Sequence, residues 1–92
     1  MTEQFKIIAM GGSEFTLGFR LAGIETIETE TPREDFEKIF EDPTVGIIIT
    51  DEKIMQELPE HFREDVEARV KPVTVALSTT AAAQETLRKK TH

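Results

Sequence analysis

The stretch FKIIAMGGSEFTLGFRLAGIETI, from Phe5 to Ile27, decides the fold. An apolar run stops at Gly11 and Gly12, a helix-like pattern follows, and a second short apolar run begins at Ile24. Strand, glycine turn, helix and strand in this order are typical of the first βαβ unit of nucleotide-binding folds. The stretch therefore predicts a parallel α/β sheet and makes the glycine turn a candidate phosphate site.

Four strands are predicted, and helical patterns separate them. They are FKIIAM (5–10), IETIET (24–29), VGIIIT (45–50) and PVTVAL (72–77). Val and Ile dominate the first and third with little polar alternation, which is typical of central strands covered on both faces. Right-handed crossovers then predict a three-layer α/β domain that is Rossmann-like (flavodoxin- or receiver-like). We expect a four-stranded parallel sheet, order 2-1-3-4, with helices on both faces.

The helix ends are marked by capping and breaking residues. Ser13 is the expected cap of the first helix and Gly23 its stop, and Thr31 precedes a proline at the start of the second. The third strand is followed by Asp51 in a capping position. The last crossover is then expected to form two helical pieces that bend at Pro59.

Composition limits the size and the partners of the chain. Its 92 residues suffice for one α/β core over 1–78 and a C-terminal helical segment over 79–92, whose apolar content is only alanines and Leu87. A formal charge of −7 argues against nucleic acid as a partner. There is no cysteine, and the run VGIII is far too short to cross a membrane. These features favour a soluble, cytoplasmic chain without membrane insertion. We also expect a monomer when the chain is isolated.

No ligand motif is complete at the glycine turn. A P-loop needs a lysine and a Ser/Thr after its second glycine, and a dinucleotide site needs a helix start free of acid, whereas Glu14 lies in the first helical turn here. A phosphoryl-accepting receiver needs an acceptor aspartate at the end of the third strand, but that strand ends in Thr50. His61 lies within the acid-rich segment EHFREDVE, which is typical of a solvated helix face, and His92 is terminal, so neither indicates a catalytic triad or a metal cluster. We expect no catalytic, cofactor or metal site.

Three segments resemble one known family. The run GGSEFTLGFRLAGI (11–24) resembles the amino-terminal signature of the F subunit of archaeal A-type and vacuolar-type ATP synthases. DPTVGIIITDEKI (42–54) resembles the third strand and the helix after it, and LPEHFREDVEARVKPVTVALS (58–78) resembles the helix before a proline-led fourth strand. The likeness covers roughly residues 6 to 78.

The resemblance implies a non-catalytic subunit of the central stalk of a proton- or sodium-translocating enzyme. It implies binding to the long coiled coil of the D subunit, which we call the stalk coiled coil, and contact with the catalytic head subunits. It also implies a C-terminal helix with a role in coupling. Members of the family commonly end in a short aromatic-containing tail, whereas this chain ends at Thr91-His92, as expected of a truncated chain or a naturally short member.

The candidate partner-interface residues lie on two helices. Phe15, Leu17, Phe19 and Leu21 cannot all face one sheet, so some of them are expected to form an apolar contact patch. The candidates are Phe19 and Arg20 in the first helix and Gln84, Leu87 and Arg88 in the last segment. Two other functions stay open at this point: a stand-alone pseudo-receiver signalling module and a small nucleotide-binding protein.

Overall fold

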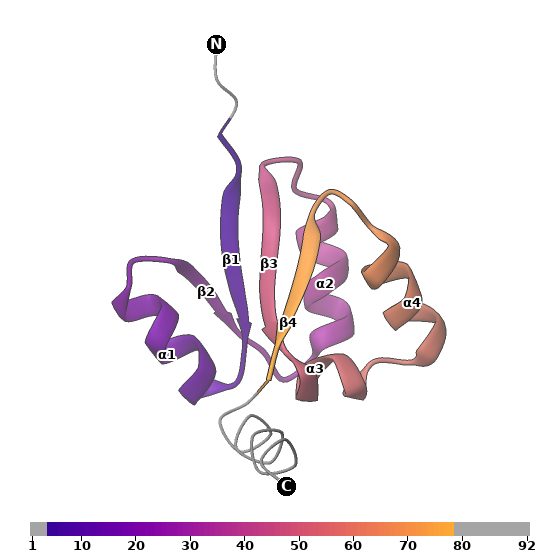
Figure 1. Ribbon diagram of the computed structural model, residues 1–92, viewed down its shortest axis with the longest axis horizontal. Helices are drawn as coiled ribbons and strands as arrows, with labels where there is room; N and C mark the ends of the chain where they lie inside the picture. The colour runs from indigo at the N-terminus through magenta and orange to yellow at the C-terminus, as the bar shows by residue number, and fades with distance from the viewer. Residues whose placement is uncertain (1–3, 79–92) are drawn as a thin grey trace, which may run out of the picture.

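Four parallel strands form one sheet in the order β2-β1-β3-β4 in the computed structural model, which describes residues 4–78 (Figure 1). The strands are β1 (Lys6–Gly11), β2 (Glu25–Glu28), β3 (Val45–Asp51) and β4 (Val73–Leu77). The predicted strands, their parallel direction and the order 2-1-3-4 are confirmed. The segment 79–92, with the predicted interface residues Gln84, Leu87 and Arg88, lies outside the described residues.

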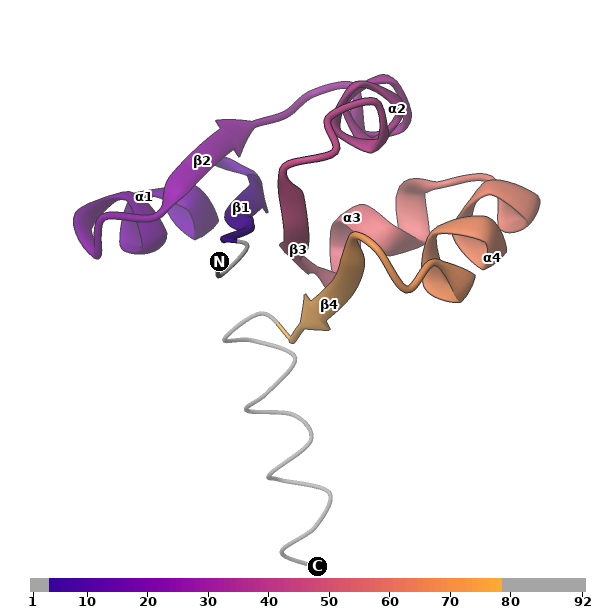
Figure 2. The same ribbon diagram turned by 90° about the horizontal axis from the view of Figure 1, so that it is seen from above.

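Helices connect the strands and lie on opposite faces of the sheet. They are α1 (Ser13–Leu21), α2 (Pro32–Phe40), α3 (Glu52–Glu57) and α4 (Glu60–Ala68). Figure 2 shows α1 next to β1 and β2 on one face, and α2, α3 and α4 on the other. The predicted break at Pro59 is confirmed, because this residue separates α3 from α4. One face thus has three helices, and the other has α1 alone among the described elements.

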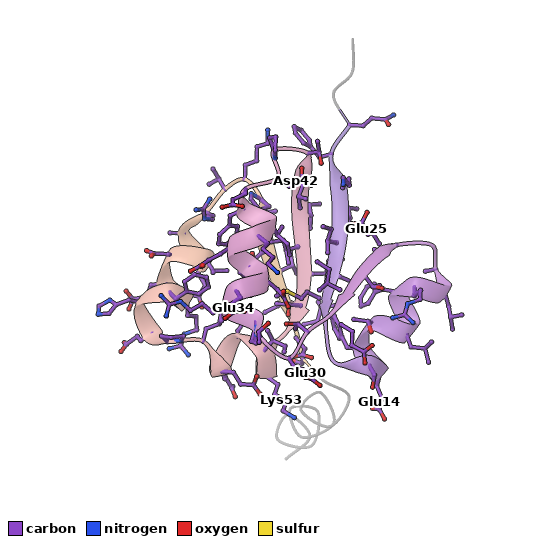
Figure 3. All side chains as sticks on the ribbon, turned by 180° about the vertical axis from the view of Figure 1, so that it is seen from behind. Glu14, Glu25, Glu30, Glu34, Asp42 and Lys53 are labelled. Atoms are coloured by element: carbon purple, nitrogen blue, oxygen red, sulfur yellow. The ribbon has the colours of Figure 1, made fainter. Side chains whose placement is uncertain are left out.

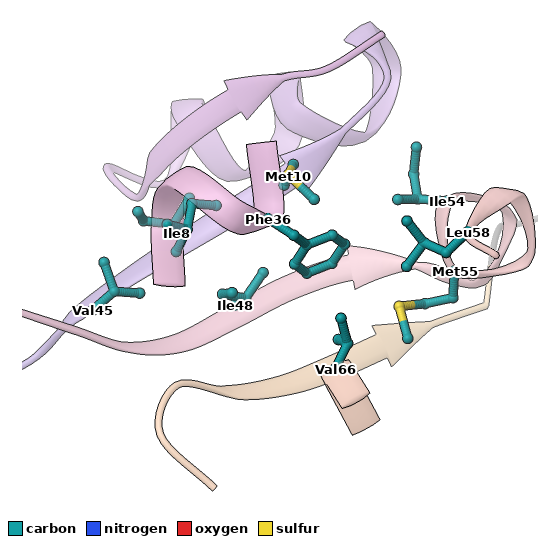
Figure 4. Close-up of a cluster of buried hydrophobic side chains, with 10 residues drawn as sticks. Ile8, Met10, Phe36, Val45, Ile48, Ile54, Met55, Leu58 and Val66 are labelled. Atoms are coloured by element: carbon teal, nitrogen blue, oxygen red, sulfur yellow. The ribbon is translucent and has the colours of Figure 1, made fainter. Parts of the chain in front are cut away.

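The hydrophobic core lies between the sheet and helices α2, α3 and α4. Its buried side chains are Ile8, Met10, Phe36, Ile39, Val45, Ile48, Ile54, Met55, Leu58 and Val66 (Figure 4). Phe36 is completely buried, with its ring centroid 5.8 Å from that of Phe40 and 6.2 Å from that of Phe62. The guanidinium of Arg69 lies 3.9 Å from the centroid of the Phe40 ring, so a cation covers the outer side of this aromatic cluster.

A glycine in β3 allows the chain to pass closely at the amino end of the sheet. Lys6 pairs with Val45, but Ile7 pairs with Ile47, so Gly46 is the extra residue of a bulge. A Cβ on Gly46 would lie 2.5 Å from Cβ of Phe5, closer than two non-bonded carbon atoms can approach. The glycine therefore makes room for Phe5 without displacing the strand.

The predicted helix caps have mixed outcomes. Asp51 caps α3 as expected, since its Oδ1 accepts a hydrogen bond of 2.7 Å from the backbone N–H of Ile54. The expected cap at Ser13 is wrong: Gly12 occupies the N-cap position in extended backbone geometry, so the helix begins at Ser13 itself. Thr31 is the N-cap of α2 but makes no side-chain hydrogen bond. Its N–H instead donates to the hydroxyl of Thr29, which in turn donates to Asp35.

Asp42 fastens the turn between α2 and β3. Its Oδ1 accepts hydrogen bonds from the hydroxyl and the backbone N–H of Thr44, at 2.6 and 2.9 Å, and its Oδ2 lies 3.5 Å from Nζ of Lys6. These bonds from Thr44, and then the charge of Lys6, hold the pKa of Asp42 below its ordinary value of 3.8. The stabilisation is present above pH 3.8 and is lost as the pH falls through the lowered pKa.

Replacing Asp51 by alanine should destabilise the domain through the lost cap. The N–H of Ile54 would lose its acceptor at a buried helix start, so we expect Asp51→Ala to lower the free energy of unfolding by about 1–2 kcal/mol. Thr31→Ala is the matched control, because its side chain makes no capping bond, and it should cost less than about 0.5 kcal/mol. Urea unfolding of both variants measures the difference, and equal losses would contradict it.

Candidate functional site

The glycine turn between β1 and α1 is occupied by a phenylalanine. A Cβ placed on Gly11 would lie 2.7 Å from Cδ2 of Phe15 and 3.3 Å from its Cβ, so the ring uses the space that the missing side chain leaves. The carbonyl of Gly11 accepts from the backbone N–H of Thr29, and that of Gly12 accepts from the N–H and the hydroxyl of Thr16. The turn is therefore fixed by the domain's own packing and hydrogen bonds.

The depression beside this turn is mainly acidic. It has a volume of about 600 Å³ and lies at the carboxyl edge of the sheet; its lining residues are Gly12, Ser13, Glu14, Phe15, Thr29, Glu30, Asp51, Lys53, Ile54, Glu57 and Ser78. Figure 3 shows Glu14, Glu30 and Lys53 at this end of the molecule. One lysine faces four carboxylates here, an arrangement that disfavours phosphate.

Asp51 cannot serve as a receiver-type phosphate acceptor in this geometry. Its side chain is 7% exposed, and Oδ1 is held by the N–H of Ile54. A phosphoryl acceptor must instead present its carboxylate to solvent and to a bound cation. Within residues 4–78 there is no group of three or more His, Cys, Asp or Glu side chains that could hold a metal ion.

The outer surface of α1 contains two of the predicted interface residues. Phe19 is half-buried with its ring centroid 5.0 Å from that of Phe15, and Arg20 is exposed, its Nε donating to the hydroxyl of Thr26 on β2 at 3.3 Å. Leu17 and Leu21 lie on the solvent side of the same helix and are 50% and 80% exposed. The structure places Phe19 against the domain and the two leucines outward, so the apolar patch expected on this helix consists of leucines.

A larger apolar surface lies on the sheet itself. We define the open sheet face as the side chains of β1, β3 and β4 that point away from the core, namely Ile7, Ile47, Ile49, Val73, Val75 and Leu77. Ile7, Val73, Val75 and Leu77 are each 40–41% exposed, and Ile47 and Ile49 are half-buried. Among the described residues, the expected cover on both faces is confirmed at Ala9 of β1, which is completely buried, and is incomplete at Ile7 and along β3.

The sequence contained one signal for the open sheet face. In PVTVAL the larger side chains of Val73, Val75 and Leu77 alternate with Thr74 and Ala76, a period of two that belongs to a strand with two unlike faces. Each connection between strands places its helix or helices on one face of the sheet. Only the first connection, which contains α1, does so on the side of the open sheet face. Counting helices per face would have indicated the incomplete cover within residues 4–78.

No helix within residues 4–78 is both long enough and apolar enough to span a membrane.

Comparisons with known proteins agree with one another. Residues 7–91 match the family described as ATP synthase (F/14-kDa) subunit. The F subunit of the A-type ATP synthase of Methanosarcina acetivorans is 33% identical over 89 residues, which are 92% of this chain and 88% of that protein. The corresponding protein of Methanococcoides burtonii is 36% identical with the same coverage. The crystal structure of the V-type ATP synthase F subunit from Archaeoglobus fulgidus superposes with a TM-score of 0.71 at 26% identity, covering 80% of this chain and 98% of that one.

Two neighbouring glycines should respond differently to substitution. Gly11→Ala should lower the free energy of unfolding by about 1–3 kcal/mol, because its Cβ would collide with the base of the Phe15 side chain. Gly12→Ala should change it by less than about 1 kcal/mol, because open space surrounds that position. Urea unfolding checks both values.

The same turn should not bind nucleotide. Calorimetry on the wild-type chain should show no ATP binding at micromolar concentration, because acidic side chains and Phe15 occupy the place of a phosphate. Micromolar binding that is lost in both glycine variants would establish the turn as a ligand site and contradict this interpretation.

Proposed function

The chain belongs to the F-subunit family of A-type and V-type ATP synthases, and on this premise we propose that it is a non-catalytic subunit of the central stalk. In this role it binds the stalk coiled coil and helps to couple ATP synthesis or hydrolysis to ion transport. It is a peripheral component on the cytoplasmic side of the membrane-bound complex. The catalytic head subunits are its further partners.

The observation that supports a binding role is the unequal cover of the sheet. Three helices enclose the core on one face, whereas four aliphatic side chains on the open sheet face remain 40–41% exposed. Contiguous exposed aliphatic surface on a charged domain is typical of protein-binding sites. A protein that works inside an assembly needs such a surface.

The geometry at the carboxyl edge of the sheet disfavours the alternative functions. A nucleotide-binding module would use the glycine turn, where Phe15 takes up the space beside Gly11. A pseudo-receiver would present the edge around Asp51, whose carboxylate caps α3. The functional residues we infer therefore lie in partner-binding surfaces and not in a catalytic site.

Binding to the stalk coiled coil should depend on the segment after Ser78. Leu87 is its only large apolar residue, so we expect Leu87→Asp to weaken binding to the isolated stalk coiled coil by more than about tenfold. The melting temperature of the free chain should stay nearly unchanged. Thr86→Asp is the control with the same change in charge at the neighbouring position, and it should weaken binding much less.

Isothermal calorimetry with the wild-type chain and the stalk coiled coil measures these affinities. A wild-type chain that does not bind the stalk coiled coil at all would overturn the proposed function. Binding that Leu87→Asp leaves intact would remove the segment after Ser78 from the interface.

A further inference from the structure

The open sheet face is shaped to receive one helix. Resting on the proposed stalk function, we propose that a single helix of the stalk coiled coil lies along this face, beside α1. The partner helix would carry an apolar stripe flanked by basic residues. This assigns the docking surface, which membership of the family does not supply.

The width of the face matches one α-helix. Ile7, Ile47 and Val73 lie in one row across β1, β3 and β4, and Ile49 and Val75 form the next row. Two strand spacings of roughly 4.8 Å make the face about 10 Å wide, which is the diameter of an α-helix with its side chains. A helix that presents apolar residues at positions i, i+3, i+4 and i+7 would contact both rows.

The neighbouring half of the same face already has such a cover. On that half α1 lies against β1 and β2, and Ala9 of β1 is completely buried. Helices that pack side by side have axes roughly 8–10 Å apart, so a second helix over β3 and β4 would continue the layer that α1 begins. The docked helix thus completes the three-layer arrangement that a parallel sheet requires.

The chain's own remaining segment is a poor occupant. Its 14 residues begin after Ser78 at the carboxyl end of β4, and they offer three alanines and Leu87 as apolar residues. Six aliphatic side chains form the open sheet face. One leucine cannot cover them, whereas a long helix of the stalk coiled coil has many turns on which to present a second apolar stripe, on the side away from the seam with its own partner helix.

Charge disfavours a second copy as the occupant and favours a basic partner. No charged residue belongs to the open sheet face, but the chain around it carries a formal charge of −7. Two copies placed face to face would bring like charges together, which opposes association. Basic residues on both sides of a partner's apolar stripe would instead complement the net negative charge of the chain.

Two charge substitutions test the assignment. Val75→Asp places a carboxylate in the centre of the face, and we expect it to weaken binding to the stalk coiled coil by more than about tenfold. Val70→Asp is the matched control, since Val70 is 89% exposed in the connection before β4, and its affinity should stay within about twofold of wild type. Thermal unfolding of both variants reports whether they fold.

A cysteine at the same position gives a second test that does not depend on a charged variant folding. The chain has no cysteine, so Val75→Cys introduces a single thiol that can carry a short photo-crosslinker. Cross-linking to the stalk coiled coil, with Val70→Cys giving none, would support the proposal. Cross-linking to the chain's own segment after Ser78, or to a second copy, would overturn it.

The outcomes separate this inference from the proposed function. If the wild-type chain binds the stalk coiled coil, and Val75→Asp binds it equally well in a folded state, the docking face is wrong and the stalk function stands. If the wild-type chain does not bind the stalk coiled coil, the proposed function fails, and the docking inference that rests on it fails too.

Discussion

A parallel sheet has two faces to bury, and the described helices cover the two faces of this domain unequally. Met10, Phe36 and Val66 are completely buried between the strands and the helices α2, α3 and α4. On the opposite face α1 covers only β1 and β2. Within residues 4–78, the packed face supplies most of the buried core, and the other face keeps aliphatic surface on which a further helix can pack.

The domain's own residues occupy the turn that binds phosphate in many proteins of this architecture. In nucleotide-binding proteins of this architecture, the first turn leaves its helix start open to phosphate. Here Phe15 packs against Gly11, and Glu14 adds negative charge at the amino end of α1. Gly11 leaves room for the ring of Phe15, so the turn fixes the direction of α1. Partner recognition is then left to the surfaces of the sheet and of α1.

Most of the architecture could be predicted from local patterns. Apolar runs with Val and Ile located the strands, because these runs are short-range signals. The order 2-1-3-4 followed from taking the two most apolar strands as central, with right-handed crossovers connecting the strands. The caps were harder: Asp51 acts as expected, but Ser13 does not, since Gly12 adopts the extended N-cap geometry and the helix starts one residue earlier than a cap at Ser13 would allow. Capping depends on backbone angles that residue type alone does not determine.

The candidate surface was harder still to predict, because the open sheet face depends on how many helices cover each side of a folded sheet, which no single segment encodes. Val73 and Val75 look like core residues in sequence and become surface only because no described helix lies over this face of β4.

Methyl NMR can locate the docking surface residue by residue, because the open sheet face consists entirely of Ile, Val and Leu. Labelled methyl groups of the chain are titrated with the unlabelled stalk coiled coil. We expect shifts and intermolecular contacts at Ile47, Ile49, Val73 and Val75, with the core methyl groups of Ile48 and Val66 unchanged. Contacts confined to Leu17 and Leu21 on α1, with Ile49 and Val75 unaffected, would contradict it.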